Sequence, residues 1–204
     1  LPMKTVEAEA VLTLAQGHAR NVLGVELLSD GRFLSYSKDR TLRIWSLDDG
    51  SLLHTLQGHA DDVNGIKILF DGRFLSYSDD GTLRIWNGLD GSLLHTLGGH
   101  TNGVLGVEVL SSGSVLSYSW DRTLRIWDVE DGSLLHTLEG HTDSIRGVEL
   151  LSEGRILSYS GDRTLRIWNG TDGTLLHTLE GHTKGVNGVE SVSYTHLTLP
   201  TRRF

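Results

Sequence analysis

Serine, histidine and aspartate recur together four times in this chain, and these three residue types can form the catalytic triad of a hydrolase. In the first set, His18 lies 17 residues before Ser35 and 21 before Asp39, and the later sets keep this spacing. An imidazole between a hydroxyl and a carboxylate can activate the hydroxyl as a nucleophile. A catalytic centre is needed only once, however, so four identical sets favour a structural hydrogen-bond network.

A tryptophan follows each aspartate and extends each set to four polar side chains. The aspartate can accept a hydrogen bond from the imidazole, and the imidazole can accept one from the serine hydroxyl. The serine oxygen can in turn accept a hydrogen bond from the indole N–H, which only donates. Each bond contributes about 1 kcal/mol net, but an orphaned buried partner costs roughly 1–3 kcal/mol. We therefore expect each set to tie the loop before a first strand to the second and third strands. The sets are His18, Ser35, Asp39, Trp45; His59, Ser76, Asp80, Trp86; His100, Ser117, Asp121, Trp127; and His141, Ser158, Asp162, Trp168.

These sets belong to a 41-residue repeat in which 22 of the 41 columns are identical across four units. Gly-His starts each unit, and Leu-Arg-Ile-Trp recurs within it at the same spacing. In the first unit, four β-rich segments separated by turn residues are expected at residues 21–28, 33–37, 41–45 and 51–56. Short strands with turns every eight to twelve residues predict an all-β fold with hairpin connections. No segment has the 3.6-residue period of a helix.

A lone four-stranded sheet of this kind cannot bury two apolar faces, whereas sheets stacked around an axis can. The repeat period, the Gly-His pairs and the Trp127-Asp128 pair resemble the WD40-repeat β-propeller family, over residues 10 to about 190. Ser46, Asn87 and Asn169 replace that aspartate in the other units. The resemblance implies an all-β, WD40-type β-propeller of about four four-stranded antiparallel blades, a partial or small propeller. It also implies that the four polar sets are the family's structural tetrads.

The domain organisation follows from the repeat. Residues 1–9 are a lead-in, and residues 10–190 are the repeats, with units at 17–57, 58–98, 99–139 and 140–180 and a partial unit at 181–190. Residues 10–16 align with a fourth strand, and residues 186–190 are expected to open another first strand. Residues 192–201 match a translated sequencing-library adapter, so we expect the tail at 191–204 to be an artefact. On this interpretation the chain is a fragment of a longer propeller, truncated near Glu190.

Composition excludes several classes of function. The chain has 18 Lys and Arg against 26 Asp and Glu, and a net charge of −8 argues against a nucleic-acid partner. No apolar run approaches the roughly 20 residues that cross a bilayer, so no membrane partner is expected. The chain has no cysteine and no secretory signal pattern, and we expect a cytoplasmic protein. Four of its ten histidines share one fourth-strand column, on separate blades and too far apart for one metal ion, so neither a metal nor a cofactor is expected.

The columns that differ among the units indicate a binding surface. The resemblance implies that they converge on the top rim of the ring, where propellers hold peptides and proteins. Trp120 is the only tryptophan outside the tetrad column, and aromatic and Arg residues are favoured at interfaces. The alternative is that these are solvated loop residues. The predicted partner-binding residues are Leu23, Lys38, Asn64, Asp79, Leu105, Trp120 and Arg146.

We therefore expect a non-catalytic scaffold that binds a protein or peptide. The resemblance implies that it is part of a larger signalling or regulatory protein, since bacterial arrays of this kind often follow effector domains. The alternative is a self-assembling half-propeller, a homo-dimer joined through its open blade edges into an eight-bladed ring. An enzymatic role would need a non-repeating cluster of acids or histidines, for which Asp62 with Asp79 is the only hint.

Overall fold

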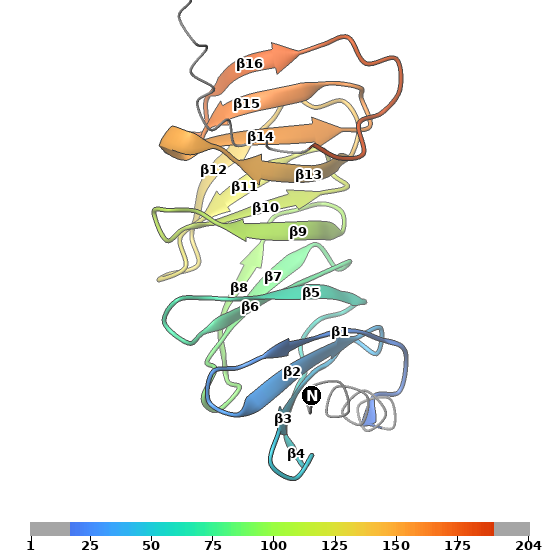
Figure 1. Ribbon diagram of the computed structural model, residues 1–204, viewed down its shortest axis with the longest axis vertical. Coiled ribbons are helices and arrows are strands. Elements are labelled where there is room, and N and C mark those ends of the chain that lie inside the picture. Colours follow the sequence, from blue (N-terminus) through green and yellow to red (C-terminus); the bar gives the residue numbers. More distant parts are fainter. Residues whose placement is uncertain (1–16, 190–204) are drawn as a thin grey trace, which may run out of the picture.

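The computed structural model describes residues 17–189, which form four antiparallel sheets of four strands each, joined in sequence order (Figure 1). We call these sheets blades 1 to 4. Blade 1 contains β1 (Val22–Leu27), β2 (Arg32–Ser37), β3 (Leu42–Ser46) and β4 (Leu52–Leu56). Blade 2 contains β5 (Val63–Ile68), β6 (Phe74–Ser78), β7 (Thr82–Trp86) and β8 (Leu93–Gly98). Blade 3 contains β9 (Val104–Val109), β10 (Val115–Ser119), β11 (Leu124–Trp127) and β12 (Leu134–Leu138). Blade 4 contains β13 (Ile145–Leu150), β14 (Arg155–Ser160), β15 (Leu165–Asn169) and β16 (Leu175–Leu179).

The predicted all-β fold and its four-stranded antiparallel blades are confirmed, and the four strands predicted in the first unit differ from β1–β4 by one residue at most at either end. Within residues 18–189 the one helical element is a short 3₁₀ turn at Ser152–Gly154. No helix in this range is long and apolar enough to cross a membrane.

The recurring Gly-His has a steric reason. A Cβ on Gly58 would come within 2.7 Å of the guanidinium of Arg84, on the third strand of the same blade. A side chain at this position would therefore have to displace that guanidinium. A Cβ on Gly99 or Gly140 would meet the equivalent Arg in the same way, whereas a Cβ on Gly17 would come within 2.5 Å of the indole of Trp45.

The hydrophobic core lies between the blades. One face of each blade presents four aliphatic side chains, and the next blade covers them with a face that includes its tetrad tryptophan. The first joint packs Leu34, Leu42, Ile44 and Leu56 against Val63, Ile66, Phe74 and Trp86. The same columns recur in the joints between blades 2 and 3 and between blades 3 and 4. Since each blade needs a neighbour on both faces, the repeat can be stable only as a stack.

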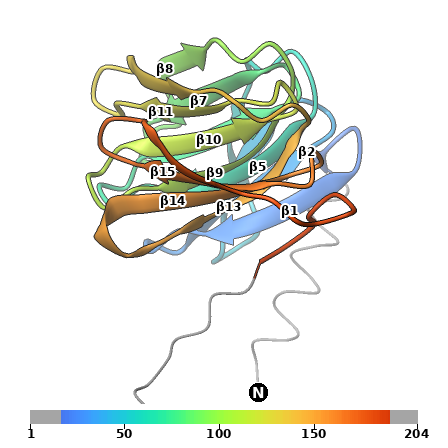
Figure 2. The same cartoon turned by 90° about the horizontal axis from the view of Figure 1, so that it is seen from above.

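The four blades stack in one row, and their first strands β1, β5, β9 and β13 lie side by side along it (Figure 1). The view from above shows the successive sheets fanned over one another (Figure 2). The described residues do not form a closed ring, so blades 1 and 4 each have one face without a neighbouring blade.

The partial fifth unit differs from its prediction. Residues 186–189 form no strand, although the N–H of Val186 donates to the carbonyl of Ser160 at 3.1 Å. A first strand needs a second strand as its ladder partner, and the partial unit at 181–190 carries none. The predicted fourth strand at residues 10–16, the lead-in at 1–9 and the tail at 191–204 lie outside the described residues.

Candidate functional site

The four predicted tetrads form hydrogen-bonded chains. In blade 1, His18 Nδ1 lies 2.8 Å from Asp39 Oδ2, and His18 Nε2 lies 2.7 Å from the Ser35 hydroxyl. The indole N–H of Trp45 donates to the same hydroxyl at 2.9 Å. Because the indole only donates and the carboxylate only accepts, the directions follow: Nδ1–H donates to Asp39, and Nε2 accepts from Ser35. The other three blades have the same three contacts at 2.8–3.0 Å.

Each tetrad also includes a threonine that the sequence analysis missed. Thr41 Oγ1 and the N–H of Thr41 both donate to Asp39 Oδ1, at 2.6 and 3.0 Å, and the N–H of Ala19 donates to Oδ2 at 2.9 Å. Burial alone would raise the pKa of Asp39, but these bonds and the one from His18 outweigh it and hold the pKa at about 2. The identity of this threonine in all four units was the signal available in the sequence.

The tetrads are closed to substrates. The serine of every tetrad is fully buried, and its hydroxyl is occupied by both the imidazole and the indole. A nucleophilic serine must instead face a carbonyl carbon that it can attack. Burial also lowers the pKa of His18 and His141, which keeps these imidazoles neutral. The geometry therefore fits a structural clamp, and the triad interpretation has no accessible nucleophile.

The top rim, at the ends of the blades that carry the tetrad aspartates, has an open groove across blades 2, 3 and 4. It has a volume of about 510 Å³, and Trp120 stands in it with 51% of its surface exposed. Two of the predicted residues, Asp79 and Trp120, line this groove. The other lining residues are Asp61, Asn102, Arg122, Asp143 and Ser144.

The remaining predicted rim residues lie outside the groove lining. Asn64 holds the groove wall, because its amide donates to Asp79 Oδ1 at 2.7 Å and to the carbonyl of Val104 at 3.0 Å. Lys38 Nζ pairs with Asp62 Oδ2 across the first joint at 3.3 Å. Arg146 donates to Asn187 Oδ1.

The two leucines of this predicted set do not join the groove either. Leu23 is exposed on blade 1, and Leu105 is half-buried on blade 3. Leu105 and Trp120, two of the predicted binding residues, therefore do not form one apolar surface in the groove lining.

The opposite rim carries inter-blade clamps that the sequence analysis did not recognise. Arg32, at the start of β2, donates to the carbonyls of Gly88 and Leu89 in blade 2, at 2.7 and 2.9 Å. Arg73 reaches blade 3 in the same way, to the carbonyl of Val129 at 2.8 Å and to Glu130 at 2.5 Å. An Arg in this column of three of the four units was the available signal.

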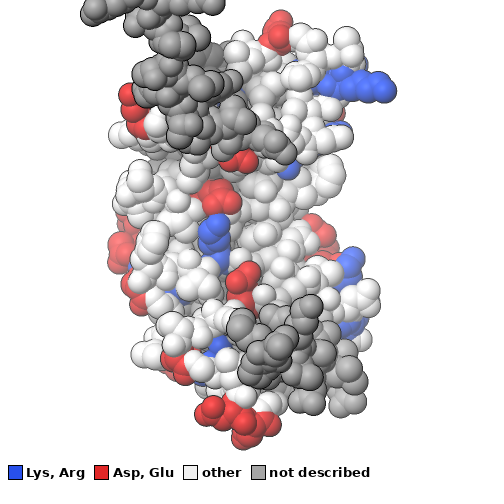
Figure 3. Space-filling view, in the orientation of Figure 1, with Lys and Arg blue, Asp and Glu red and all other residues white. Residues whose placement is uncertain are grey.

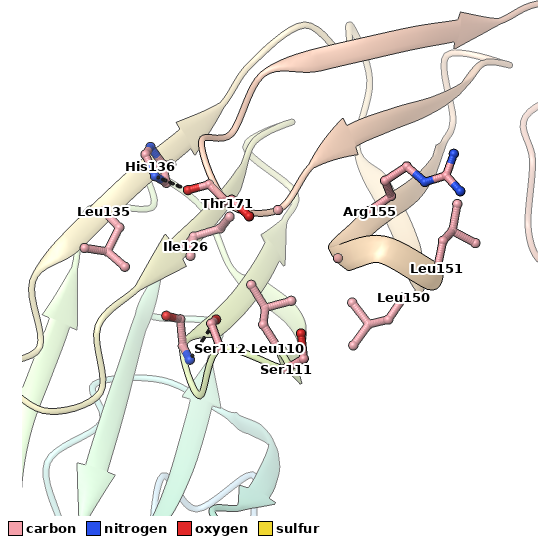
Figure 4. Close-up of a pocket in the computed structure, with 13 residues that line it drawn as sticks. Leu110, Ser111, Ser112, Ile126, Leu135, His136, Leu150, Leu151, Arg155 and Thr171 are labelled. Atoms are coloured by element: carbon pink, nitrogen blue, oxygen red, sulfur yellow. Dashed lines mark hydrogen bonds between the residues drawn. The ribbon is translucent and has the colours of Figure 1, made fainter.

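Blade 3 lacks this clamp, and a cavity of about 220 Å³ lies at its joint with blade 4 (Figure 4). Ser114 occupies the clamp column there, and the cavity reaches the core residue Ile126. His136 Nε2 donates to the carbonyl of Thr171 across the joint at 3.1 Å. Arg155 points away from Leu110 and Ile126 in this view, so its guanidinium does not fill the gap (Figure 4).

Comparison with protein families follows the blade pattern. A family model described as WD domain, G-beta repeat, matches residues 9–46, 50–87, 91–128 and 132–169. The chain belongs to the WD40 repeat family. Among curated proteins no match is found. WD40 repeats are generally protein-binding scaffolds and are typically non-catalytic. Within residues 17–189 of this WD40 chain, no group of three or more His, Asp or Glu side chains is placed to hold a metal ion.

Proposed function

We propose that this WD40 chain is a scaffold that binds a peptide segment of a partner protein in the top-rim groove around Trp120. The observation that carries the proposal is a tryptophan exposed in an open groove, while the four tetrad tryptophans are buried. A large aromatic side chain exposed in a groove is typical of binding hot spots, because it offers much apolar area at little conformational cost. The groove walls come from the variable columns, so this surface could diverge while the scaffold stayed constant.

The charges of the groove favour a basic segment as ligand. Three carboxylates, Asp61, Asp79 and Asp143, face one guanidinium, that of Arg122. A Lys or Arg side chain placed over the indole of Trp120 would gain a cation–π contact and approach these carboxylates. On the face shown in Figure 3, acidic and basic side chains are interspersed.

Fluorescence titration with two peptide pools of equal length, one Lys/Arg-rich and one Asp/Glu-rich, tests this function. Binding is followed by the fluorescence anisotropy of a dye attached to the peptides, a signal that remains measurable in a variant without the exposed Trp120. Trp120→Ala should abolish the response to the basic pool at an unchanged Tm. Phe70→Ala is the matched control, because Phe70 is 94% exposed and lies outside the groove. Equal binding of both pools, or binding that survives Trp120→Ala, contradicts the proposal.

The role within a larger signalling or regulatory protein stays a prediction. The second candidate, a self-assembling half-ring, uses different surfaces, namely the faces of blades 1 and 4 that have no neighbouring blade. The observation in its favour is Leu179, which is 44% exposed, whereas its equivalents in the other blades, Leu56, Leu97 and Leu138, are buried.

A further inference from the structure

The two rim clamps show how a joint between blades can be held at the rim opposite the groove. An Arg at the start of the second strand reaches the turn between the third and fourth strands of the next blade. There it meets a backbone carbonyl and, in the second joint, a carboxylate, that of Glu130. The clamp side chains are well covered, with Arg32 and Arg73 exposing 16% and 17% of their side-chain surface.

Blade 4 carries the same clamp residue, but the part of the chain that the structure describes, residues 17–189, provides no further blade for it to hold. Arg155 occupies the clamp column, but its contacts are weak and local, to the carbonyl of Ser152 at 3.3 Å and to Glu153 at 3.5 Å. Its side chain is 40% exposed, more than twice the value of its two equivalents. The apolar face beside it is also open, as the exposure of Leu179 shows.

Blade 1 carries the complementary half of a joint. Leu47 and Asp48 occupy the columns of Val129 and Glu130, so its turn offers a carbonyl and a carboxylate. Both side chains are exposed, and no Arg of the described residues reaches this turn. Val25 is 43% exposed, although the residues in its column at the first two joints, Ile66 and Val107, are buried.

We infer that blade 4 of one copy of this chain docks head to tail on blade 1 of a second copy. In this contact Arg155 of one copy binds the carbonyl of Leu47 and the carboxylate of Asp48 in the other, as Arg73 binds Val129 and Glu130 within the chain. Leu179 then packs beside Val25. The same contact made twice closes two chains into a ring of eight blades, which lies within the range of known propellers. The top-rim groove plays no part in it, so this inference is independent of the proposed peptide-binding function. It rests on the second candidate function, the self-assembling half-ring, and names its contacts.

Two features limit the size of the contact. Phe33 and Trp45, which stack with ring centroids 6.2 Å apart, are already buried within the chain, so the second copy meets the edges of blade 1. Val186, four repeats after Val22, already occupies part of the open face of blade 4. Val22 of the second copy must displace it. Weakening the hold of Val186 should therefore strengthen the association.

Light scattering on the full chain from about 1 to 100 µM tests the inference, with a concentration-dependent rise from 22.4 kDa to twice that mass expected. Arg155→Asp and Asp48→Arg should each weaken association at least tenfold, since each leaves a charged partner unpaired. The double exchange should restore it. Arg163→Asp, the same change of charge on an exposed top-rim Arg of blade 4, is the control and should have no effect.

Each alternative outcome overturns a stated part of the inference. A monomer at every concentration, or a double exchange that fails to restore association, excludes the head-to-tail contact. A continuous series of higher masses that is lost in the single variants and restored in the double variant supports the head-to-tail contact but refutes the closed ring. Val186→Ser should tighten association on the order of tenfold, because a buried valine no longer competes, and an unchanged affinity refutes the placement of blade 1 on that face.

Discussion

The clamp column allows one substitution to be compared at two positions, one that reaches a next blade and one that reaches none among the described residues. Replacing Arg73 by Ser copies the residue that the repeat itself uses at Ser114, and the same change at Arg155 is the matched control. Arg73 joins blade 2 to blade 3, whereas the contacts of Arg155 with the described residues all lie within its own hairpin. We expect Arg73→Ser to destabilise the chain and Arg155→Ser to leave it nearly unchanged.

The magnitude follows from the contacts that are lost. The bond from Arg73 to the partly buried carbonyl of Val129 has a charged donor and contributes about 1.5–3 kcal/mol. The partners Glu130 and Asp71 are largely exposed, so those ion pairs add about 0–1 kcal/mol each. Freeing an ordered Arg side chain returns up to about 2 kcal/mol. The net loss is about 1–2 kcal/mol, or a Tm lower by roughly 3–6 °C for a chain of this length. For Arg155→Ser the exposed contacts predict a change below about 0.5 kcal/mol.

Urea unfolding followed by tryptophan fluorescence measures both variants at about 1 µM protein, where copies are kept apart. The buried Trp127 lies in the joint that Arg73 clamps and reports its opening. Equal losses for the two variants would refute the inter-blade role of the clamp. If Arg73→Ser lowers the free energy of unfolding by less than about 0.3 kcal/mol, the ion pairs and the bond to the carbonyl contribute no more than the water contacts that these groups make in the unfolded chain.

Two further predictions concern the third joint and the tetrads. Ser112→Asp combined with Ser114→Arg rebuilds the missing clamp and should raise the free energy of unfolding by about 1–2 kcal/mol. A urea titration measures this gain, and either change alone should give less than half of it. Stability should also fall in two steps on acidification, measured as the urea midpoint between pH 8 and 2. Because burial lowers the pKa of His18 and His141, the unfolded chain binds more protons below pH 6.5, and stability declines from there. The pKa of Asp39 is about 2 against an ordinary 3.8, so its contribution persists above pH 3.8 and is lost as the pH falls toward 2; a flat profile from pH 8 to 3 would contradict this.

Blade 3 differs from the other blades at both rims. It carries Trp120 at the top rim and lacks the clamp at the bottom, where serines stand at 112 and 114. The two changes are independent in space, because the tetrad and the core of the blade lie between them. The divergence of one unit therefore altered the surfaces and left the hydrogen-bonded interior as in its neighbours.

Residue types and spacing were sufficient to predict the tetrads, because each is a local network within one blade. Donor and acceptor chemistry alone orders His, Ser, Asp and Trp into one chain, and the repeat presents the same answer four times. The threonine bonded to each tetrad aspartate also lies close to it in the sequence, two residues further on. It was missed because a threonine that is identical in every unit can equally be conserved among the units as a strand-forming residue.

The groove was only half predictable. The column of Asp79 and Trp120 was recognised as variable and placed on the top rim, yet Leu105 and Arg146 do not line the groove. Which side chains share a groove depends on how far each blade is rotated against the next. That rotation is decided by packing in the joints, which no single unit records.

The amino-acid sequence by itself determined the blade: its length, its four strands, its turns and its internal clamp, because these depend on contacts within 41 residues. The tertiary structure alone decided how the blades meet, which Arg reaches a neighbour and where the core opens beside Ser114. It also decided that, among the described residues, blades 1 and 4 each have one face without a neighbouring blade. Identical residues in successive units make different contacts because each interacts with what the next blade provides, as Arg73 and Arg155 show.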